Sequence, residues 1–150
     1  MLTKQITAED KETFFALCKK FYDSGATKRD FDYNLTEITF NQVISNHENL
    51  WGYFICTDDG SIAGYGLITS YWCNEEGGNV IILDELYICP EFRHHGLAHC
   101  FLGWIESEFR EKAVSVTLEV LSTNVAAKDL YSKSGYYEDG FVTLSKKIDE

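Results

Sequence analysis

The segment over residues 80–89 is the most apolar stretch of the sequence, and its only charged residues are Asp84 and Glu85. A nearly continuous apolar run of this length indicates a strand buried on both faces, as in the centre of a mixed sheet. Pro90 follows directly and ends the strand, because proline cannot donate to a sheet ladder. The sequence therefore predicts an α/β fold organised around one central strand.

The periodicity of apolar residues predicts the elements on both sides of this strand. Helices are expected over residues 10–22, 36–45, 97–109 and 124–134, and strands over 52–57, 62–72, 114–121 and 141–148. In the second helix, Ile38, Val43 and Ile44 are expected to face inward. This order indicates a single domain over residues 1–150, with one mixed sheet and helices in an α/β (α+β) arrangement rather than a repeating βαβ fold.

Two turn signals support these boundaries. Asp58-Asp59-Gly60 separates two aromatic and β-branched runs, which is typical of a hairpin. Gly135 follows the helix expected over 124–134 and suits a left-handed cap at its C-terminal end. We therefore expect the strands over 52–57 and 62–72 to pair with each other.

The charge balance restricts the partners of the protein. Thirteen basic residues against 24 acidic ones give a formal net charge of −11 and a pI near 4.7. A surface with this excess of negative charge repels phosphate polymers and anionic membranes, which argues against a nucleic-acid or membrane-surface binder. A small cationic partner suits the charge better.

The cysteines and the hydrophobic pattern indicate a cytoplasmic protein without a metal site. The five cysteines form no C-x-x-C pair, so neither a zinc spacing nor a disulfide framework is present, and their apolar neighbours predict reduced core residues. They are Cys18, Cys56, Cys73, Cys89 and Cys100. The N-terminal residues lack the apolar stretch of a signal peptide, and segment 61–74 is too short and too polar for a membrane span.

The helix expected after Pro90 lacks the residues that normally cap a helix start. No Ser, Thr, Asp, Asn or Glu occurs over residues 92–105. The stretch is instead basic and carries small residues, in the order Arg93-His94-His95-Gly96-Leu97-Ala98-His99. A positive helix start with free backbone N–H groups favours an anion, most often a phosphate. The alternative is a helix start whose N–H groups are satisfied by water.

Two segments resemble the Gcn5-related N-acetyltransferase (GNAT) superfamily. Residues 93–98 match the pattern R/Q-x-x-G-x-G/A after a strand, and residues 124–136 are similar to N-x-x-A-x-x-L-Y-x-x-x-G-F/Y. The two segments have the order and spacing of the family, and the element order covers essentially the whole chain. The resemblance implies a GNAT fold with a splayed central strand pair, and transfer of an acetyl group from acetyl-CoA to a primary amine.

The resemblance also implies where coenzyme A binds. In the pattern that starts at Arg93, the pyrophosphate is held by backbone amides, here those of His94, His95, Gly96, Leu97, Ala98 and His99. Backbone groups of Leu86, Tyr87 and Ile88 pair with the pantetheine arm, and Asn124 contacts the cofactor from the other side of the splay. Tyr131 matches the position that commonly protonates the leaving thiolate.

This sequence departs from the family pattern at two places. Ala98 stands where glycine is commoner, although the pattern tolerates a methyl group there. His94 and His95 stand where a basic residue and glycine often occur, so phosphate affinity is expected to fall as pH rises through the ordinary titration range of histidine. The alternative is that this histidine pair is exposed and has no role.

The acids of the central strand are the candidates for the catalytic base. Similarity to diamine and other small-amine acetyltransferases, which often carry an acidic pair here, makes Glu85 the first choice and Asp84 the second. Successive strand residues face opposite sides, so only one of them is expected to face the substrate. The alternative is an ordinary half-buried acid in an ion pair.

Further residues are candidates for recognising the acceptor. Tyr71, Trp72 and Trp51 could line an amine pocket because aromatic faces attract cations, with core packing as the alternative. Four acids in predicted turns could steer a cation inward, and these are Glu75, Glu76, Glu138 and Asp139.

Several alternatives stay open at this stage. They are acetylation of a protein N-terminus or lysine, and a GNAT-fold module that binds coenzyme A without turnover. Family analogy also makes a homodimer possible. The acceptor itself (a polyamine, an aminoglycoside, an amino acid or a peptide) is not identified by the sequence.

Overall fold

The computed structural model describes residues 1–45 and 47–148, and it contains one mixed sheet with the strand order β1-β2-β3-β4-β5. The strands are β1 (Leu2–Gln5), β2 (Leu50–Cys56), β3 (Ile62–Cys73), β4 (Gly78–Ile88) and β5 (Ser115–Leu118). The helices are α1 (Lys11–Asp23), α2 (Tyr33–Ile44), α3 (Leu97–Phe109) and α4 (Val125–Lys133), with 3-10 turns at Ala8–Asp10 and Pro90–Phe92. Neighbouring strands are antiparallel except β4 and β5, which are parallel. The predicted mixed sheet is thus confirmed.

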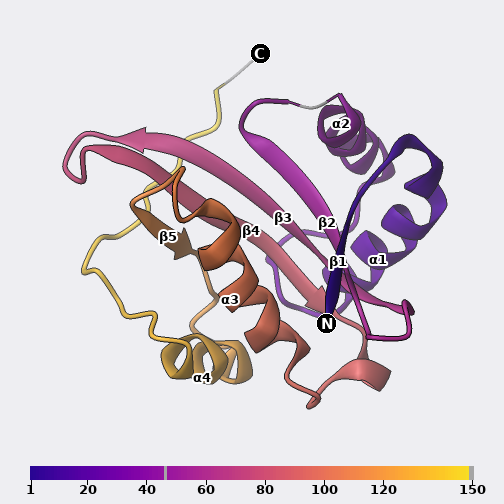
Figure 1. The fold of residues 1–150 in the computed structure, drawn as a ribbon. Helices are drawn as coiled ribbons and strands as arrows, with labels where there is room; N and C mark the ends of the chain where they lie inside the picture. Colours follow the sequence, from indigo (N-terminus) through magenta and orange to yellow (C-terminus); the bar gives the residue numbers. More distant parts are fainter. Residues whose placement is uncertain (46, 149–150) are drawn as a thin grey trace.

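Helices cover both faces of the sheet, with α1 and α2 on one face and α3 and α4 on the other (Figure 1). Under α1 and α2, Phe14 and Phe40 pack with Tyr65 of β3 in one buried cluster. Under α3, Phe101 and Ile105 pack with strand residues in a second cluster. Both faces of the central strands are therefore buried, which explains the apolar run that ends at Pro90.

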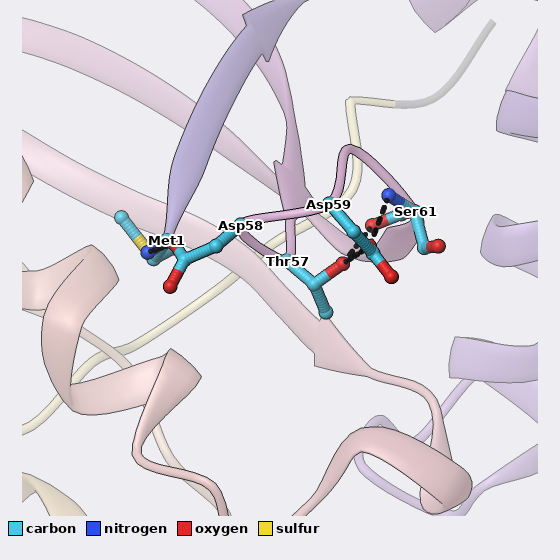
Figure 2. A network of polar contacts seen from close by, with 5 residues as sticks. All are labelled: Met1, Thr57, Asp58, Asp59 and Ser61. Atoms are coloured by element: carbon cyan, nitrogen blue, oxygen red, sulfur yellow. Dashed lines mark hydrogen bonds and ion pairs between the residues drawn. The ribbon is translucent and has the colours of Figure 1, made fainter.

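The predicted hairpin joins β2 and β3. Gly60 has φ +88°, and the Asp59 carboxylate accepts from the Ser61 N–H at 3.1 Å and from the Thr57 hydroxyl. Figure 2 shows this turn together with the Met1 amino group, which pairs with Asp58. These contacts hold the β2–β3 turn and the start of β1 together.

Strand β1 is not evident from the sequence. Its residues Leu2–Gln5 are mostly exposed and lack an alternating apolar pattern. The strand exists because Leu2 pairs with Cys56 and Gln5 with Tyr53 of β2, which places β1 at the edge of the sheet. Backbone pairing therefore decides this element, which side-chain periodicity cannot reveal.

The prediction of a final strand over residues 141–148 is wrong. This segment forms no ladder with any described residue, and Phe141, Val142, Leu144 and Ile148 are exposed. In Figure 1 it continues from α4 as an extended trace toward the C-terminus. Alternating side chains are compatible with a strand, but a strand also requires neighbouring backbone groups to pair with.

The second helix also differs from the expectation. It begins at Tyr33 because Asp32 caps it, accepting from the Leu35 N–H at 3.0 Å. The inward face follows the i, i+4, i+7 spacing of Thr36, Phe40 and Val43, which are buried, whereas Ile38 lies off this face and is 58% exposed. The prediction that Ile38 faces inward is therefore wrong, and that for Val43 is confirmed.

The cysteines are free thiols in different surroundings. Cys18, Cys56 and Cys89 are buried as expected, Cys73 is partly exposed, and Cys100 is exposed on α3. The prediction of a core position is wrong for Cys100, because helical rotation places it beside the inward Phe101 and Leu102 but facing outward. In the described part of the chain, no helix has the length and hydrophobicity needed to cross a membrane.

Candidate active site

The central strand pair separates halfway along β4. Strand β5 pairs with β4 only from Val80 to Leu83, and no described residue pairs with β4 on that side beyond this point. The separation begins at a bulge, because Leu67 of β3 pairs with Glu85 while the next residue, Ile68, pairs with Leu83. Asp84 is the extra residue, and a bulge bends and twists the strand that carries it. The predicted splay is present, with Asp84 at its origin.

Backbone groups of β4 face the open side of this splay. The Cys89 N–H donates to the Ala63 carbonyl of the β3 side at 2.8 Å. Alternation along an antiparallel ladder then directs the N–H and C=O groups of Tyr87 toward β3, and those of Leu86 and Ile88 toward the splay. Leu86 therefore offers its N–H and C=O groups to an extended ligand, and Ile88 offers its N–H, because its carbonyl accepts from Arg93. Of the three predicted residues, Tyr87 already pairs its backbone groups with β3, so these groups are not available to a ligand.

Arg93 folds back over the end of β4. Its Nε donates to the Ile88 carbonyl at 2.9 Å, and its guanidinium lies 5.6 Å from the centre of the Tyr87 ring. The side chain thereby fixes the loop that leads from β4 into α3. The Tyr87 ring supports the Arg93 guanidinium and does not line the splay.

The start of α3 presents a row of free backbone N–H groups. Gly96 is the N-cap residue with φ +76°, His94 has φ +63°, and no side chain caps the helix. The first helical bond runs from the Cys100 N–H to the Gly96 carbonyl at 2.9 Å, and within residues 1–45 and 47–148 the N–H groups of His94 through His99 have no protein acceptor. Residues 93–96 are exposed. Such a concave set of free donors suits an anion.

Helix α4 lies next to this site and is capped by Asn124. The Asn124 Oδ1 accepts from the Ala127 N–H at 3.2 Å, which leaves its amide nitrogen available as a donor. At the other end, His99 Nδ1 lies 3.0 Å from Ser134 Oγ. Because the Ser134 hydroxyl donates to the Leu130 carbonyl at 2.9 Å, His99 is the donor in this pair. The contact joins the start of α3 to the end of α4.

Tyr131 lies on α4 and packs against the cluster under α3. Its ring is partly buried and meets the Tyr136 ring edge-on, with 5.9 Å between ring centres. Burial raises the pKa of the Tyr131 hydroxyl, so the group keeps its proton at neutral pH. A group with these properties can act as a proton donor.

Glu85 lies on the opposite face of the sheet, under α1. Its Oε2 accepts from the Tyr65 hydroxyl at 2.6 Å and its Oε1 from the Tyr22 hydroxyl at 3.0 Å. Burial raises the pKa of Glu85, the two tyrosine hydroxyls lower it, and the nearby Asp84 raises it. The sequence reasoning missed these two partners, because tyrosines at helix and strand spacing predict core packing and nothing more.

Asp84 lies in a different environment although it precedes Glu85 directly. Its side chain is exposed at the bulge, yet surrounding protein atoms partly desolvate the carboxylate, and this desolvation and the charge of Glu119 raise its pKa. The two acids therefore lie in different surroundings, because the bulge at Asp84 interrupts the regular alternation of β4.

A small cavity of about 80 Å³ opens beside Glu85. It lies between α1, the connection to α2 and α2 itself, and Tyr22 and Glu85 form part of its wall. The connection adds two carboxylates, Asp30 and Asp32, and one guanidinium, Arg29. The acidic groups outnumber the basic one, so the cavity suits a small cation or an amine.

The aromatic residues proposed for an amine pocket lie elsewhere. Trp51 packs edge-on against Phe109 at 5.2 Å, in the cluster under α3. Tyr71 and Trp72 are exposed at the far end of β3. A larger groove of about 610 Å³ lies there, between α3, β5 and residues 134–139. None of these three side chains lines the cavity beside Glu85, and Trp51 takes the alternative role of core packing.

Of the four acids expected to steer a cation, two line that larger groove. They are Glu76 and Asp139. Glu138 forms an ion pair with Lys128 of α4 at 3.0 Å, and Glu75 is exposed in the β3–β4 turn. The carboxylates at the cavity beside Glu85 come instead from the connection between α1 and α2, which the sequence presents only as a polar loop.

Solved structures of acetyltransferases share this fold. The chain matches a possible acetyltransferase from Clostridium difficile 630 with a TM-score of 0.86 and 15% identity, covering 99% of this chain and 98% of that one. It matches AAC(6')-Iy, in complex with the bisubstrate analogue CoA-S-monomethyl-acetylneamine, with a TM-score of 0.80 and 14% identity, covering 99% of this chain and 98% of that one. A ribosomal-protein-alanine N-acetyltransferase from Brucella melitensis biovar Abortus 2308 matches with a TM-score of 0.76 and 12% identity, covering 98% of this chain and 100% of that one.

The sequence itself matches the acetyltransferase (GNAT) family over residues 10–136. The protein therefore belongs to this family, as the two motifs predict. A comparison with curated proteins found no significant match.

Proposed function

We propose that the protein transfers the acetyl group of acetyl-CoA directly to the primary amine of a small cationic molecule. One observation carries the proposal: free backbone donors suited to an anion follow the end of β4, and an acidic cavity lies beside Glu85 of the same strand, on the face of the sheet that α1 covers. The free N–H groups before and in the first turn of α3 suit a pyrophosphate, and Glu85 adjoins the cavity. Together these features accommodate an anionic donor and a cationic acceptor.

The residues present fit coenzyme A. Backbone amides from His94 to His99 would hold the pyrophosphate, and a Cβ at Gly96 would meet no atom within 4 Å, so the approach to these amides is open. Leu86 and Ile88 would pair with the pantetheine arm as an added strand does, and the amide nitrogen of Asn124 would donate from α4. Bound acetyl-CoA supplies the acetyl group in an activated thioester.

Two side chains are assigned to the proton transfers. Glu85 receives the proton of the acceptor amine, directly or through a water molecule, because most alkyl amines are protonated at neutral pH. Asp84 is the second candidate for this role. Tyr131 holds a proton at Oη for the sulfur atom that leaves as the amide bond forms.

The size and charge of the cavity favour a small cationic acceptor over a peptide. A cavity of about 80 Å³ admits an aminoalkyl group, and Glu85, Asp30 and Asp32 at its wall favour a positive charge. Among the structural neighbours, AAC(6')-Iy was solved with an acetylneamine analogue, whereas the Brucella enzyme is a ribosomal-protein-alanine N-acetyltransferase. The fold alone thus allows both acceptor classes, and the cavity supports the first.

A panel of amines tests the proposal, with release of the coenzyme A thiol as the readout. We expect turnover with diamines, polyamines or aminoglycosides and little with neutral amino acids or peptides. Turnover with peptides alone would contradict the acceptor class while retaining the chemistry. If coenzyme A binds but no amine releases thiol, the protein is a binding module and the catalytic proposal fails.

A further inference from the structure

Two tyrosine hydroxyls from different elements converge on the two oxygens of one carboxylate. Tyr65 of β3 donates to Glu85 Oε2 at 2.6 Å, and Tyr22 of α1 donates to Oε1 at 3.0 Å. Both oxygens of the Glu85 carboxylate are therefore held, one by a residue of the sheet and the other by a residue of the helix that covers it. Each oxygen keeps a further lone pair for a ligand.

Core packing alone does not explain the Tyr65 hydroxyl. The side chain is fully buried at 0% exposure, among Phe14 at 5.7 Å and Phe21 at 6.3 Å between ring centres. A hydroxyl in such apolar surroundings is costly unless it is hydrogen-bonded, and phenylalanine would fill the same space. The acceptor that satisfies this hydroxyl is Glu85.

We propose that Tyr65 and Tyr22 are positioning residues for acetyl transfer, which hold the Glu85 carboxylate in one orientation at the wall of the acidic cavity. This role rests on the proposed function, in which Glu85 receives the proton of the acceptor amine. A glutamate side chain has several rotatable bonds, and two fixed donors remove most of this freedom before the amine arrives. The hydroxyls also favour the ionised carboxylate, the form that can accept a proton.

Other groups that face Glu85 act on the same equilibrium. Asp84 on β4 raises the pKa of Glu85, and so does burial, which is the largest effect. The Cys18 thiol of α1 lies beside Tyr65, and burial raises its pKa to about 12, so it stays neutral. The cavity wall adds Arg29, which favours the ionised carboxylate, and Asp30 and Asp32, which oppose it. The two hydroxyls therefore act against burial and Asp84, and the pKa of Glu85 still lies above its ordinary value.

The Tyr65→Phe variant tests the proposal through the pH dependence of kcat/KM. Removing a donor to the ionised carboxylate raises the pKa of Glu85, so the acidic limb of the profile should move to higher pH by about one to two units. At pH values above this shifted acidic limb, kcat/KM of the variant should approach that of the wild type. Tyr22→Phe should give a smaller shift, because its hydrogen bond is longer and less buried.

The Tyr53→Phe variant is the matched control. Tyr53 of β2 loses the same atom, but it packs against Trp104 under α3, on the other face of the sheet. Its pH profile should coincide with that of the wild type. A Tyr65→Phe variant whose kcat/KM falls by the same factor at every pH would overturn the positioning role, since that result indicates general damage to the fold.

A second measurement needs no substrate. The ¹³C chemical shift of the Glu85 carboxyl carbon, assigned with Glu85→Gln, reports the pKa of Glu85 in the free protein. We expect a higher value in Tyr65→Phe than in wild type and Tyr53→Phe. An unchanged titration in an active Tyr65→Phe variant overturns the positioning role alone. A wild-type protein that acetylates no amine overturns the proposed function and this role with it, whatever the titration shows.

Discussion

Neighbouring residues of β4 acquire different chemistry from their surroundings. Asp84 and Glu85 are chemically similar, yet the bulge exposes the first and directs the second under α1, where two tyrosines bind it. Tyr131 is on the other side of the sheet, with a protonated hydroxyl beside the cluster under α3. The proposed proton acceptor Glu85 and the proposed proton donor Tyr131 thus lie on opposite faces of the sheet.

The Tyr131→Phe variant tests the proposed proton donor. The ring and its packing against Tyr136 remain, so coenzyme A should bind as before. The loss should appear in kcat and amount to roughly a hundred- to ten-thousand-fold, the usual contribution of a positioned acid. Steady-state kinetics with a saturating amine measure this effect, with Tyr53→Phe as the control. Full activity in Tyr131→Phe would remove the assignment, because a tyrosine that only packs does not need its hydroxyl for catalysis.

At the scale of elements, the start of α3 is decided by backbone geometry. His94 and Gly96 adopt positive φ, and the N–H groups that follow are left without protein acceptors in the described residues. A glycine tolerates this conformation without strain, and the missing side chain leaves space for a ligand. The helix therefore begins with exposed donors instead of a cap.

The Gly96→Glu variant tests this site. Coenzyme A in hundredfold excess over its Kd should stabilise the wild-type protein by about 2.7 kcal/mol and raise its Tm accordingly. In the variant, a negative side chain at the donors should abolish this rise. Gly103→Glu places the same charge later on α3, where the added Cβ meets no atom within 4 Å, and should leave the rise intact. An equal rise in both variants would place the cofactor elsewhere.

The contact between β3 and β4 depends on a second glycine. A Cβ at Gly64 would lie 1.9 Å from the Tyr87 carbonyl oxygen, which is backbone and cannot turn aside. Gly64→Ala should therefore lower the free energy of unfolding by at least about 1–3 kcal/mol, as overpacking does. Gly103→Ala on α3 should instead raise it by about 0.5–1 kcal/mol, because alanine favours a helix. Urea unfolding measures both, and an unchanged midpoint in Gly64→Ala would show that the strands separate at little cost.

At the scale of the whole molecule, the chain has an excess of negative charge but a locally basic loop at the proposed cofactor site. The net charge is −11, yet the loop before α3 carries Arg93, His94 and His95. The cavity on the other face has acidic groups from the connection between α1 and α2. The net negative charge thus favours small cations over anions, while the proposed cofactor site depends on local donors.

The dependence of KM on salt tests this division. Salt screens the attraction of a cationic amine to the acidic surface, so KM for such an amine should rise between low and physiological ionic strength. A neutral amine accepted by the enzyme should show no such rise, and KM for acetyl-CoA should follow a different trend. Salt-independent KM values for every active amine would contradict electrostatic recognition without affecting the fold.

Predictability from sequence also depended on scale. The apolar run before Pro90, the Asp-Gly turn and the missing cap before Leu97 predicted the central strand, the β2–β3 hairpin and the start of α3 correctly. These features follow from local periodicity and turn chemistry. Strand β1 was not predicted, and a strand over 141–148 was predicted incorrectly, because a strand at an edge depends on which backbone lies beside it.

The candidate site divides in the same way. The sequence by itself determined the family motifs, the acidic pair of β4 and the free helix start, because each consists of residues adjacent in the chain. Only the tertiary structure decided that Tyr22 and Tyr65 meet on Glu85, that the acidic cavity comes from the α1–α2 connection, and that Trp51, Tyr71 and Trp72 lie away from it. These contacts join residues far apart in the sequence, and their partners are chosen by the packing of helices on the sheet, which no local pattern encodes.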